Sequence, residues 1–239
     1  MSVTEPSRLT TLNRMGRTSA HPNEYSLEFI EFAASCALPA LDIGAAFGVA
    51  TIPALAAGAT VIANDLEPQH LAILRDRTPA RDVQRLVLAH GRFPDDLEFA
   101  PNSLGAVHAS NVLNFLRGSE IQRGAELIAE WLAPAGRVFI VAGTPYARNV
   151  EATIAKYESR KRSGIVWPGE FEPIQAFSSD ATLDVLPGFL HLLDDEVLID
   201  VLARVGLIIE RAELFERANL PAYLRLDGRE NVGVVARKP

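Results

Sequence analysis

Two acids and two glycines are the residues best suited to binding a charged small molecule. Asp42 stands two residues before Gly44, and Gly48 follows four residues later, after an apolar run and before an Ala- and Leu-rich segment. Glycines in such a turn let a ligand approach the main chain closely, and the helix expected from near Val49 directs free N–H groups at the turn. The carboxylate of Asp42 suits a ligand with an ammonium group and repels one with phosphates.

The second acid, Asp65, ends the next apolar run at residues 60–65. In nucleotide-binding βαβ units, an acid at about this spacing accepts hydrogen bonds from ribose hydroxyls. The alternative for Asp65 is a turn or helix-capping carboxylate, but its spacing from Gly44 favours the ribose. The two acids therefore predict a ligand that carries both a ribose and a positive charge.

The first of these motifs resembles motif I of the class I S-adenosylmethionine-dependent methyltransferases. In that family an acid precedes closely spaced glycines, which here correspond to Asp42, Gly44 and Gly48, with Ala46 where the family often has its middle glycine. The resemblance implies S-adenosylmethionine as the cofactor, S-adenosylhomocysteine as its product and methyl transfer as the reaction.

The resemblance also implies a set of cofactor contacts. Asp42 is expected near the methionine ammonium, Asp65 at the ribose and Asn111 beside the methionyl chain. Arg92 stands where the family commonly has an acid that reaches the adenine amino group. The expected contacts are Asp42, Gly44, Ala45, Ala46, Gly48, Asp65, Leu66, Gly91, Arg92, Phe93 and Asn111.

Five further residues are candidates for the acceptor side. We expect Tyr25, Asn114, Tyr146 and Trp167 to be near the substrate, and His191 is the best placed candidate for a general base. Three of them have structural alternatives. Tyr25 also fits the edge of the core, Trp167 a contact between an insertion and the domain, and His191 a buried structural histidine.

The elements that must position these residues alternate between strand and helix patterns. The expected strands are residues 37–43, 60–65, 85–89, 104–110 and 137–142. This alternation predicts an α/β fold with a parallel sheet wound on both faces. Ligands of such sheets bind outside the carboxyl ends of the strands, where Asp42, Asp65, Gly91, Asn111 and Thr144 would gather.

Two β-rich runs, residues 207–212 and 232–236, end the chain without an obvious crossover helix between them. They are expected to pair as antiparallel neighbours. A last strand inserted antiparallel distinguishes the class I methyltransferases from dehydrogenases. The expected fold is therefore a doubly wound, seven-stranded, mostly parallel sheet in a three-layer α/β/α arrangement, and the resemblance covers roughly residues 23–145 and 190–238.

Residues 1–239 are expected to form a single domain with an insertion where the alternation fails. The expected parts are an N-terminal arm (1–22), a cofactor-binding core (23–145), a lid or substrate wall (146–190) and a C-terminal helix with a β-hairpin (191–239). Within the insertion, the basic run 160–162 lies near Glu151 and Glu158, which indicates a solvated helix face.

Composition narrows the function further. The net charge of −7 argues against a general nucleic-acid surface, and the uncharged stretch 43–63 contains glycines and a proline that fit a buried strand–turn–helix better than a membrane span. Cys36 is the single cysteine, which fits a reducing compartment, and we expect a cytoplasmic protein. The five histidines show no metal-ligand spacing, so we expect no metal.

We therefore expect methyl transfer to a small-molecule acceptor through an oxygen, nitrogen or carbon nucleophile. The acidic balance favours a small molecule, as does the sequence Ser110-Asn-Val-Leu-Asn114, which lacks the Asn/Asp-Pro-Pro-aromatic motif of many nucleic-acid methyltransferases. The alternatives are a methyltransferase acting on protein or RNA, or a non-catalytic cofactor-binding protein. A nicotinamide oxidoreductase fits less well, because the glycines do not follow G-x-G-x-x-G. The oligomeric state stays open.

Overall fold

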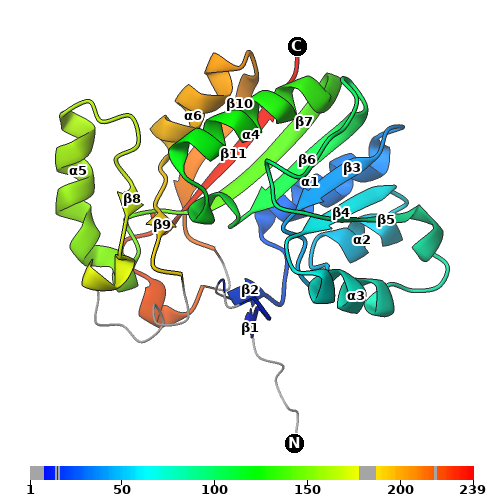
Figure 1. The fold of residues 1–239 in the computed structure, drawn as a ribbon, viewed down its shortest axis with the longest axis horizontal. Coiled ribbons are helices and arrows are strands. Elements are labelled where there is room, and N and C mark those ends of the chain that lie inside the picture. The colour runs from blue at the N-terminus through cyan, green and yellow to red at the C-terminus, as the bar shows by residue number, and fades with distance from the viewer. Residues whose placement is uncertain (1–7, 14, 16, 178–186, 218–219) are drawn as a thin grey trace, which may run out of the picture.

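The fold is organised around one seven-stranded sheet with the strand order β10-β11-β7-β6-β3-β4-β5 (Figure 1). The computed structural model describes residues 8–13, 15, 17–177, 187–217 and 220–239. The strands of this sheet are β3 (Ala40–Ile43), β4 (Val61–Asp65), β5 (Leu86–His90), β6 (Leu104–Ser110), β7 (Leu132–Gly143), β10 (Ile208–Phe215) and β11 (Asn231–Arg237). β11 runs antiparallel to both of its neighbours, and the pairs among β3 to β7 are parallel. The predicted mostly parallel sheet with an antiparallel last strand is confirmed.

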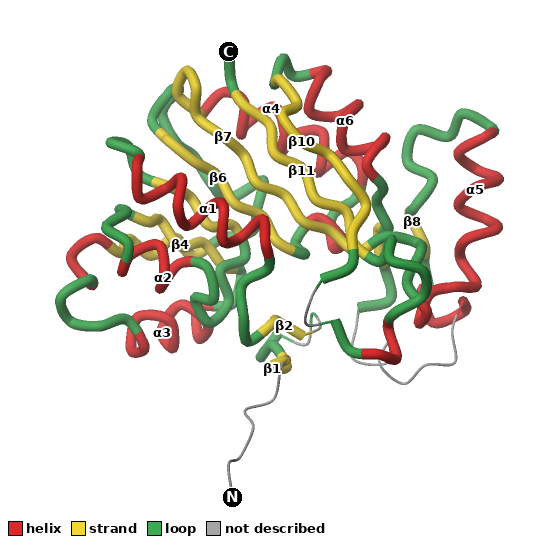
Figure 2. The backbone as a smooth tube through the Cα atoms, turned by 180° about the vertical axis from the view of Figure 1, so that it is seen from behind, coloured by secondary structure: helices red, strands yellow, loops and turns green. Residues whose placement is uncertain are grey.

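Helices cover both faces of this sheet (Figures 1 and 2). One face carries α1 (Glu24–Ser35), α2 (Thr51–Ala56) and α3 (Pro68–Arg77), and the other carries α4 (Gly118–Trp131) and α6 (Asp195–Arg204). The predicted three-layer arrangement is therefore confirmed.

The central strands β6 and β7 are buried on both sides, which explains their nearly continuous apolar sequence. Val107, Val138 and Ile140 belong to the core beneath α4 and α6. Their alternating neighbours Ala106 and Phe139 belong to the core beneath α1 and α2. The period-2 alternation of strand side chains thus divides one apolar run between two cores.

The insertion after β7 forms a small unit with its own apolar core. It contains η3 (Arg148–Thr153), α5 (Ile154–Arg162), β8 (Glu170–Phe171), η4 (Ile174–Phe177) and β9 (Leu190–His191), and β8 pairs with β9 in antiparallel fashion. The core residues of this unit are Val150, Tyr157, Phe171, Ile174, Leu190 and Leu192. Residues 178–186 of the expected insertion lie outside the described residues.

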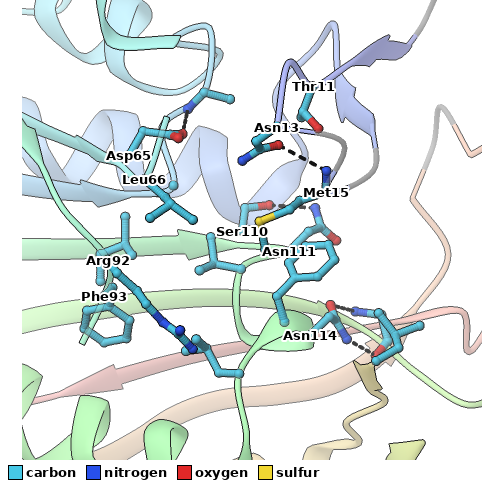
Figure 3. A pocket seen from close by; sticks show the side chains of 18 of the residues that line it. Thr11, Asn13, Met15, Asp65, Leu66, Arg92, Phe93, Ser110, Asn111 and Asn114 are labelled. Atoms are coloured by element: carbon cyan, nitrogen blue, oxygen red, sulfur yellow. Dashed lines mark hydrogen bonds between the residues drawn. The ribbon is translucent and has the colours of Figure 1, made fainter. Parts of the chain in front are cut away.

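Near the N-terminus, β1 (Arg8–Thr10) and β2 (Arg17–Ser19) form an antiparallel hairpin. We call residues 8–19 the strap, because described residues of the turn between its strands line the pocket at the carboxyl edge of the sheet (Figure 3). Three short 3₁₀ turns complete the described elements: η1 (Val83–Arg85), η2 (Leu113–Phe115) and η6 (Ala222–Leu224). Within the described part of the chain, no helix is long and apolar enough to cross a membrane.

Candidate active site

A cavity of about 530 Å³ opens at the carboxyl ends of the parallel strands. The turns after β3, β4, β5, β6 and β7 supply one part of its lining, and the strap and the insertion supply the rest (Figure 3). The lining from the strap and the insertion is Thr11, Asn13, Met15, Ala147, Asn149, Val150, Leu190 and Leu192. The location of this pocket agrees with the site that the strand pattern predicts.

The glycine turn after β3 forms one wall of the pocket. Gly44 has a φ of +66°, and a Cβ there would overlap the side chain of Val112, so both the backbone angle and the space require glycine. Ala46 also has a positive φ, +45°, and lines the pocket. Ala45 and Gly48, expected as cofactor contacts, are not in the lining. Both face the protein, since Ala45 is buried and a Cβ at Gly48 would lie 2.9 Å from side chains of α2 and α3.

Asp65, at the end of β4, lines the pocket and is tied to its surroundings by three hydrogen bonds. Its Oδ2 accepts from the backbone N–H of Ala46 at 2.9 Å, and its Oδ1 accepts from the backbone N–H of Glu67 at 2.8 Å. Oδ1 also lies 3.0 Å from Nδ1 of His70. Because a carboxylate offers about four acceptor positions, about one remains, on Oδ2, for a ligand.

Asp42 is not among the residues that line the pocket, and its expected contact with the cofactor stays a prediction. Its Oδ2 accepts from the Thr51 hydroxyl at 2.6 Å, and its Oδ1 lies 2.7 Å from Nδ1 of His108, whose Nε2 lies 3.0 Å from the Ser26 hydroxyl. Asp42, His108 and Ser26 are all at most 3% exposed. A buried carboxylate needs such partners, and here they tie β3 to the start of α2 and to α1.

One end of the pocket is lined by Leu66, Gly91, Arg92 and Phe93, as expected. The Arg92 guanidinium forms an ion pair with Glu120 of α4, so this cation is already neutralised. The Phe93 ring is buried and occupies the space where Gly124 of α4 has no side chain, because a Cβ there would lie 2.5 Å from the ring. This wall of the pocket is thereby fixed to α4.

Asn111 and Asn114 follow β6 and line the pocket as expected. Asn111 has a φ of +59°, and its amide donates to the Ser110 hydroxyl. Asn114 donates to the carbonyls of Gly143 and His191 and accepts from the Gly143 N–H, at 2.9, 2.6 and 2.8 Å. Asn114 therefore joins the end of β7 to the insertion, and its amide N–H groups are both used in doing so.

Tyr25 lies in the core instead of on the acceptor side of the pocket. Its ring occupies the space left by Gly233 of β11, its hydroxyl donates to Glu213 at 2.9 Å, and the Arg211 guanidinium lies 4.2 Å from its ring centroid. Burial and the neighbouring Glu213 raise the pKa of Tyr25, so it remains a neutral donor. Its function in this structure is to pack α1 onto the sheet.

Tyr146 likewise contacts protein and not the pocket. Its hydroxyl donates to Glu158 of α5, and the Arg229 guanidinium lies 4.0 Å from its ring centroid. Burial and the hydrogen bond to Glu158 raise the pKa of this phenol. Tyr146 thus joins β7 to the insertion and is not a substrate contact here.

Trp167, expected to grip the acceptor, packs the insertion onto the domain. Its ring occupies the space above Gly118 at the start of α4, where any Cβ would overlap it. It also meets the ring of His191 edge to face, with centroids 5.5 Å apart. Trp167 is not in the pocket lining, and its position agrees with the alternative that it forms a contact between the insertion and the domain.

His191 is fully buried outside the pocket lining, and we therefore assign it no catalytic role. Its Nδ1 donates to the carbonyl of Leu116 at 3.0 Å, while its Nε2 is buried and has no hydrogen-bond partner among the described residues. Burial lowers the pKa of His191, and the hydrogen bond to Leu116 only partly opposes this effect. The imidazole is therefore neutral at physiological pH.

Several lining residues were not expected from the sequence. The strap residues belong to a segment without apolar periodicity, so nothing local marked them. His70 lines the pocket five residues after Asp65, in the first turn of α3, and this spacing could have drawn attention to it. No group of three His, Cys, Asp or Glu side chains in the described ranges is arranged to hold a metal ion.

Replacing Trp167 by alanine is expected to lower the free energy of unfolding by about 2–4 kcal/mol, because it leaves a cavity between α4 and the insertion. The neighbouring Val166 is 58% exposed and is the matched control. Val166→Ala should change the stability by less than about 0.5 kcal/mol. Denaturant unfolding curves measure both, and equal effects of the two variants would contradict the packing role.

The lowered pKa of His191 predicts a pH-dependent stability. Below the unfolded value of 6.5 the unfolded chain binds a proton that the folded chain does not, so the free energy of unfolding falls as the pH decreases from 6.5 toward the folded pKa. The titration of His191 alone changes the free energy of unfolding by at most about 1.4 kcal/mol per pH unit. His191→Asn keeps a donor for Leu116 and does not titrate, so the difference between the two proteins should narrow with acidification. Parallel curves of stability against pH would contradict the buried neutral imidazole.

Comparisons with known proteins agree with this geometry. Residues 40–136 match a family described as a methyltransferase domain, and no curated protein sequence matches the chain. A crystal structure of an S-adenosylmethionine-dependent methyltransferase from Mesorhizobium loti has a TM-score of 0.61 and 17% identity over 84% of this chain and 91% of that one. A putative S-adenosylmethionine-dependent methyltransferase from Listeria monocytogenes has a TM-score of 0.62 and 15% identity over 90% of this chain and 98% of that one.

The glycopeptide N-methyltransferase MtfA, complexed with S-adenosyl-L-homocysteine, has a TM-score of 0.59 and 19% identity over 93% of this chain and 89% of that one. At these identities the similarity to solved structures establishes a common fold. The family match covers the glycine turn, Asp65 and the strands β3 to β6. Residues 40–136 therefore match a methyltransferase-domain family, and the chain shares the fold of these S-adenosylmethionine-dependent methyltransferases.

Proposed function

We propose that the chain transfers a methyl group from S-adenosylmethionine to a small-molecule acceptor. The observation that carries this proposal is the continuity of the pocket. One cavity of about 530 Å³ joins the glycine turn and Asp65 to the amide and apolar side chains beside the insertion. Cavities of a few hundred Å³ hold small molecules. The end with the carboxylate of Asp65 suits the cofactor, and the end with amide and apolar side chains suits the acceptor.

The residues at the cofactor end fit a nucleoside with a sulfonium better than a dinucleotide. Asp65 keeps about one acceptor position for a ribose hydroxyl. Arg92 is the one Lys or Arg side chain among the described lining residues, and Glu120 neutralises it. A pyrophosphate would find no free cation in that part of the lining, whereas a positively charged ligand meets the carboxylate of Asp65. This arrangement supports the methyltransferase over the nicotinamide oxidoreductase.

When bound, the cofactor supplies a methyl group that is already activated on sulfur and a neutral leaving group. The task of the chain is then to orient the two reactants and to exclude water. Asp65 holds the ribose, and Gly44 and Ala46 of the glycine turn line the cavity where the cofactor approaches the backbone. The strap on one side and the insertion on the other reduce the access of water to the cavity.

The side chains at the acceptor end of the pocket indicate an acceptor that reacts without a general base from the protein. Among the described lining residues the titratable side chains are Asp65, His70 and Arg92, all at the cofactor end. The acceptor end instead presents uncharged polar side chains and apolar ones. Its described residues include Phe115, Thr144, Asn149, Val150, Leu190 and Leu192. Since a general base helps only a nucleophile that still holds its proton, the acceptor we propose is an amine that is already neutral near pH 7 or a group that ionises in water.

The basic run of α5 does not favour RNA as the acceptor. Arg160 donates to the carbonyls of Pro168 and Glu170, and Lys161 pairs with Asp194 at 2.6 Å. Arg160 thus stabilises the insertion itself, and Lys161 joins the insertion to the N-cap residue of α6. The net charge of −7 acts in the same direction, because it repels a polyanion. The free thiol of Cys36 supports a reducing compartment, and we propose the cytoplasm.

Isothermal titration calorimetry tests the cofactor directly. The protein is expected to bind S-adenosylmethionine and S-adenosylhomocysteine and not NADH. Asp65→Asn should weaken binding of S-adenosylhomocysteine by about 10- to 100-fold, because the hydrogen bond from the ribose to a charged acceptor is worth about 1.5–3 kcal/mol.

Asp95→Asn makes the same charge change at an exposed acid outside the pocket lining and is the matched control. The Asp95→Asn variant should bind S-adenosylhomocysteine with the same affinity as the unchanged protein. Binding of NADH in place of the two sulfur compounds would overturn the proposed function. If the Asp65 and Asp95 variants bind S-adenosylhomocysteine with equal affinity, the ribose does not contact Asp65.

A further inference from the structure

His70 connects the acid expected at the ribose to the strap over the pocket. Its Nδ1 lies 3.0 Å from Oδ1 of Asp65, and its Nε2 lies 2.9 Å from the backbone N of Leu12 in the strap. His70 lines the pocket and is 1% exposed. The proposed methyl transfer assigns no function to this buried, polar side chain.

The two contacts define which nitrogen of His70 carries the proton. The backbone N–H of Leu12 can only donate, so Nε2 must be the acceptor and bear the lone pair. A neutral imidazole then carries its hydrogen on Nδ1 and donates it to Asp65. His70 is therefore used in full, as a donor on one side and an acceptor on the other.

This donor helps to determine how Asp65 presents its carboxylate. The N–H groups of Glu67 and His70 both engage Oδ1, while the Ala46 N–H engages Oδ2. The unused acceptor position is therefore on Oδ2. Without the N–H of His70 the carboxylate loses a partner on Oδ1, and its rotation about the Cβ–Cγ bond is less restricted.

The acceptor side of His70 holds the turn of the strap. Thr11, Asn13 and Met15 line the pocket around Leu12, across the cavity from Leu66 and Arg92 (Figure 3). The side chain of Leu12 is 48% exposed, so burial of this side chain contributes little to holding the turn. The backbone N–H of Leu12 provides a defined attachment instead.

We propose that His70 is a positioning residue that orients Asp65 for the cofactor ribose and, through the same ring, fastens the strap over the bound cofactor. This inference rests on the proposed function, since it takes the ligand of Asp65 to be the ribose. Its two hydrogen bonds can be removed separately. The amide nitrogen of asparagine occupies about the position of Nδ1, and the amide of glutamine reaches about the position of Nε2.

The experiment compares His70→Asn, His70→Gln and Leu12→Pro with the unchanged protein. His70→Asn keeps a donor for Asp65 and loses the acceptor for the strap, and Leu12→Pro removes the strap N–H without altering His70. His70→Gln keeps an acceptor for the strap and loses the donor at the Nδ1 position. Calorimetry with S-adenosylhomocysteine reports the ribose site, and the rate of tryptic cleavage within residues 8–17 reports the strap.

The expected result is a crossed pattern. His70→Asn and Leu12→Pro should increase the rate of strap cleavage about 10-fold and change the affinity for S-adenosylhomocysteine by less than about threefold. His70→Gln should instead weaken binding of S-adenosylhomocysteine about 10-fold and leave the cleavage of the strap slow. Phe47→Leu is the control, because the Phe47 ring packs on His70 with centroids 4.9 Å apart and is absent from the pocket lining. It should lower the melting temperature and shift neither readout.

Parallel shifts of both readouts in all variants, or no shift in either, would show that His70 only fills space and would overturn the inference. If His70→Asn fails to fold, Leu12→Pro against His70→Gln gives the same crossed comparison. Failure of the proposed function looks different, because the unchanged protein would then not bind S-adenosylhomocysteine. The cleavage rates of the unliganded proteins would still show whether His70 fastens the strap.

Discussion

The rest of the site depends on the hydrogen bonds that the carboxylate of Asp65 accepts. It lies at the end of β4 and accepts hydrogen bonds from the turn after β3, from the start of α3 and from His70, whose other nitrogen holds the strap. A carboxylate that is 5% exposed is stable only with such partners. These partners connect Asp65 to the turn after β3 and to the start of α3, and His70 extends the connection to the strap.

A second polar side chain, Asn114, has the corresponding function at the other end of the pocket. Its amide joins Gly143 at the end of β7 to His191 in β9 of the insertion. Trp167 adds apolar packing between the insertion and α4. The acceptor end is thus built between two elements that are distant in sequence, and its shape depends on how the insertion is fastened.

Local patterns in the sequence were sufficient to predict the architecture and much of the cofactor end. The alternation of strand and helix patterns predicted the sheet, and the antiparallel last strand followed from two β-rich runs without a crossover helix. Gly44 and Asp65 could be placed because each lies at the end of an apolar run, and strand ends meet at one edge of a parallel sheet.

The expected site residues that lie outside the pocket lining have partners far away in the sequence. Asp42 was expected at the ligand, but His108, 66 residues later, takes one of its oxygens. Tyr25 fits against the missing side chain of Gly233, and Trp167 fits against that of Gly118, neither of which a local pattern reveals. Aromatic residues near a site have the right chemistry both for a ligand and for the core, and only tertiary packing decides between the two.

The most direct test of the account is a crystal structure of the protein with S-adenosylhomocysteine. The account predicts a ribose hydroxyl within hydrogen-bond distance of Oδ2 of Asp65, the base between Leu66 and Arg92, and the sulfur directed toward the cavity beside Asn111 and Thr144. A ligand bound outside this cavity, or one whose ribose lies away from Asp65, would contradict it.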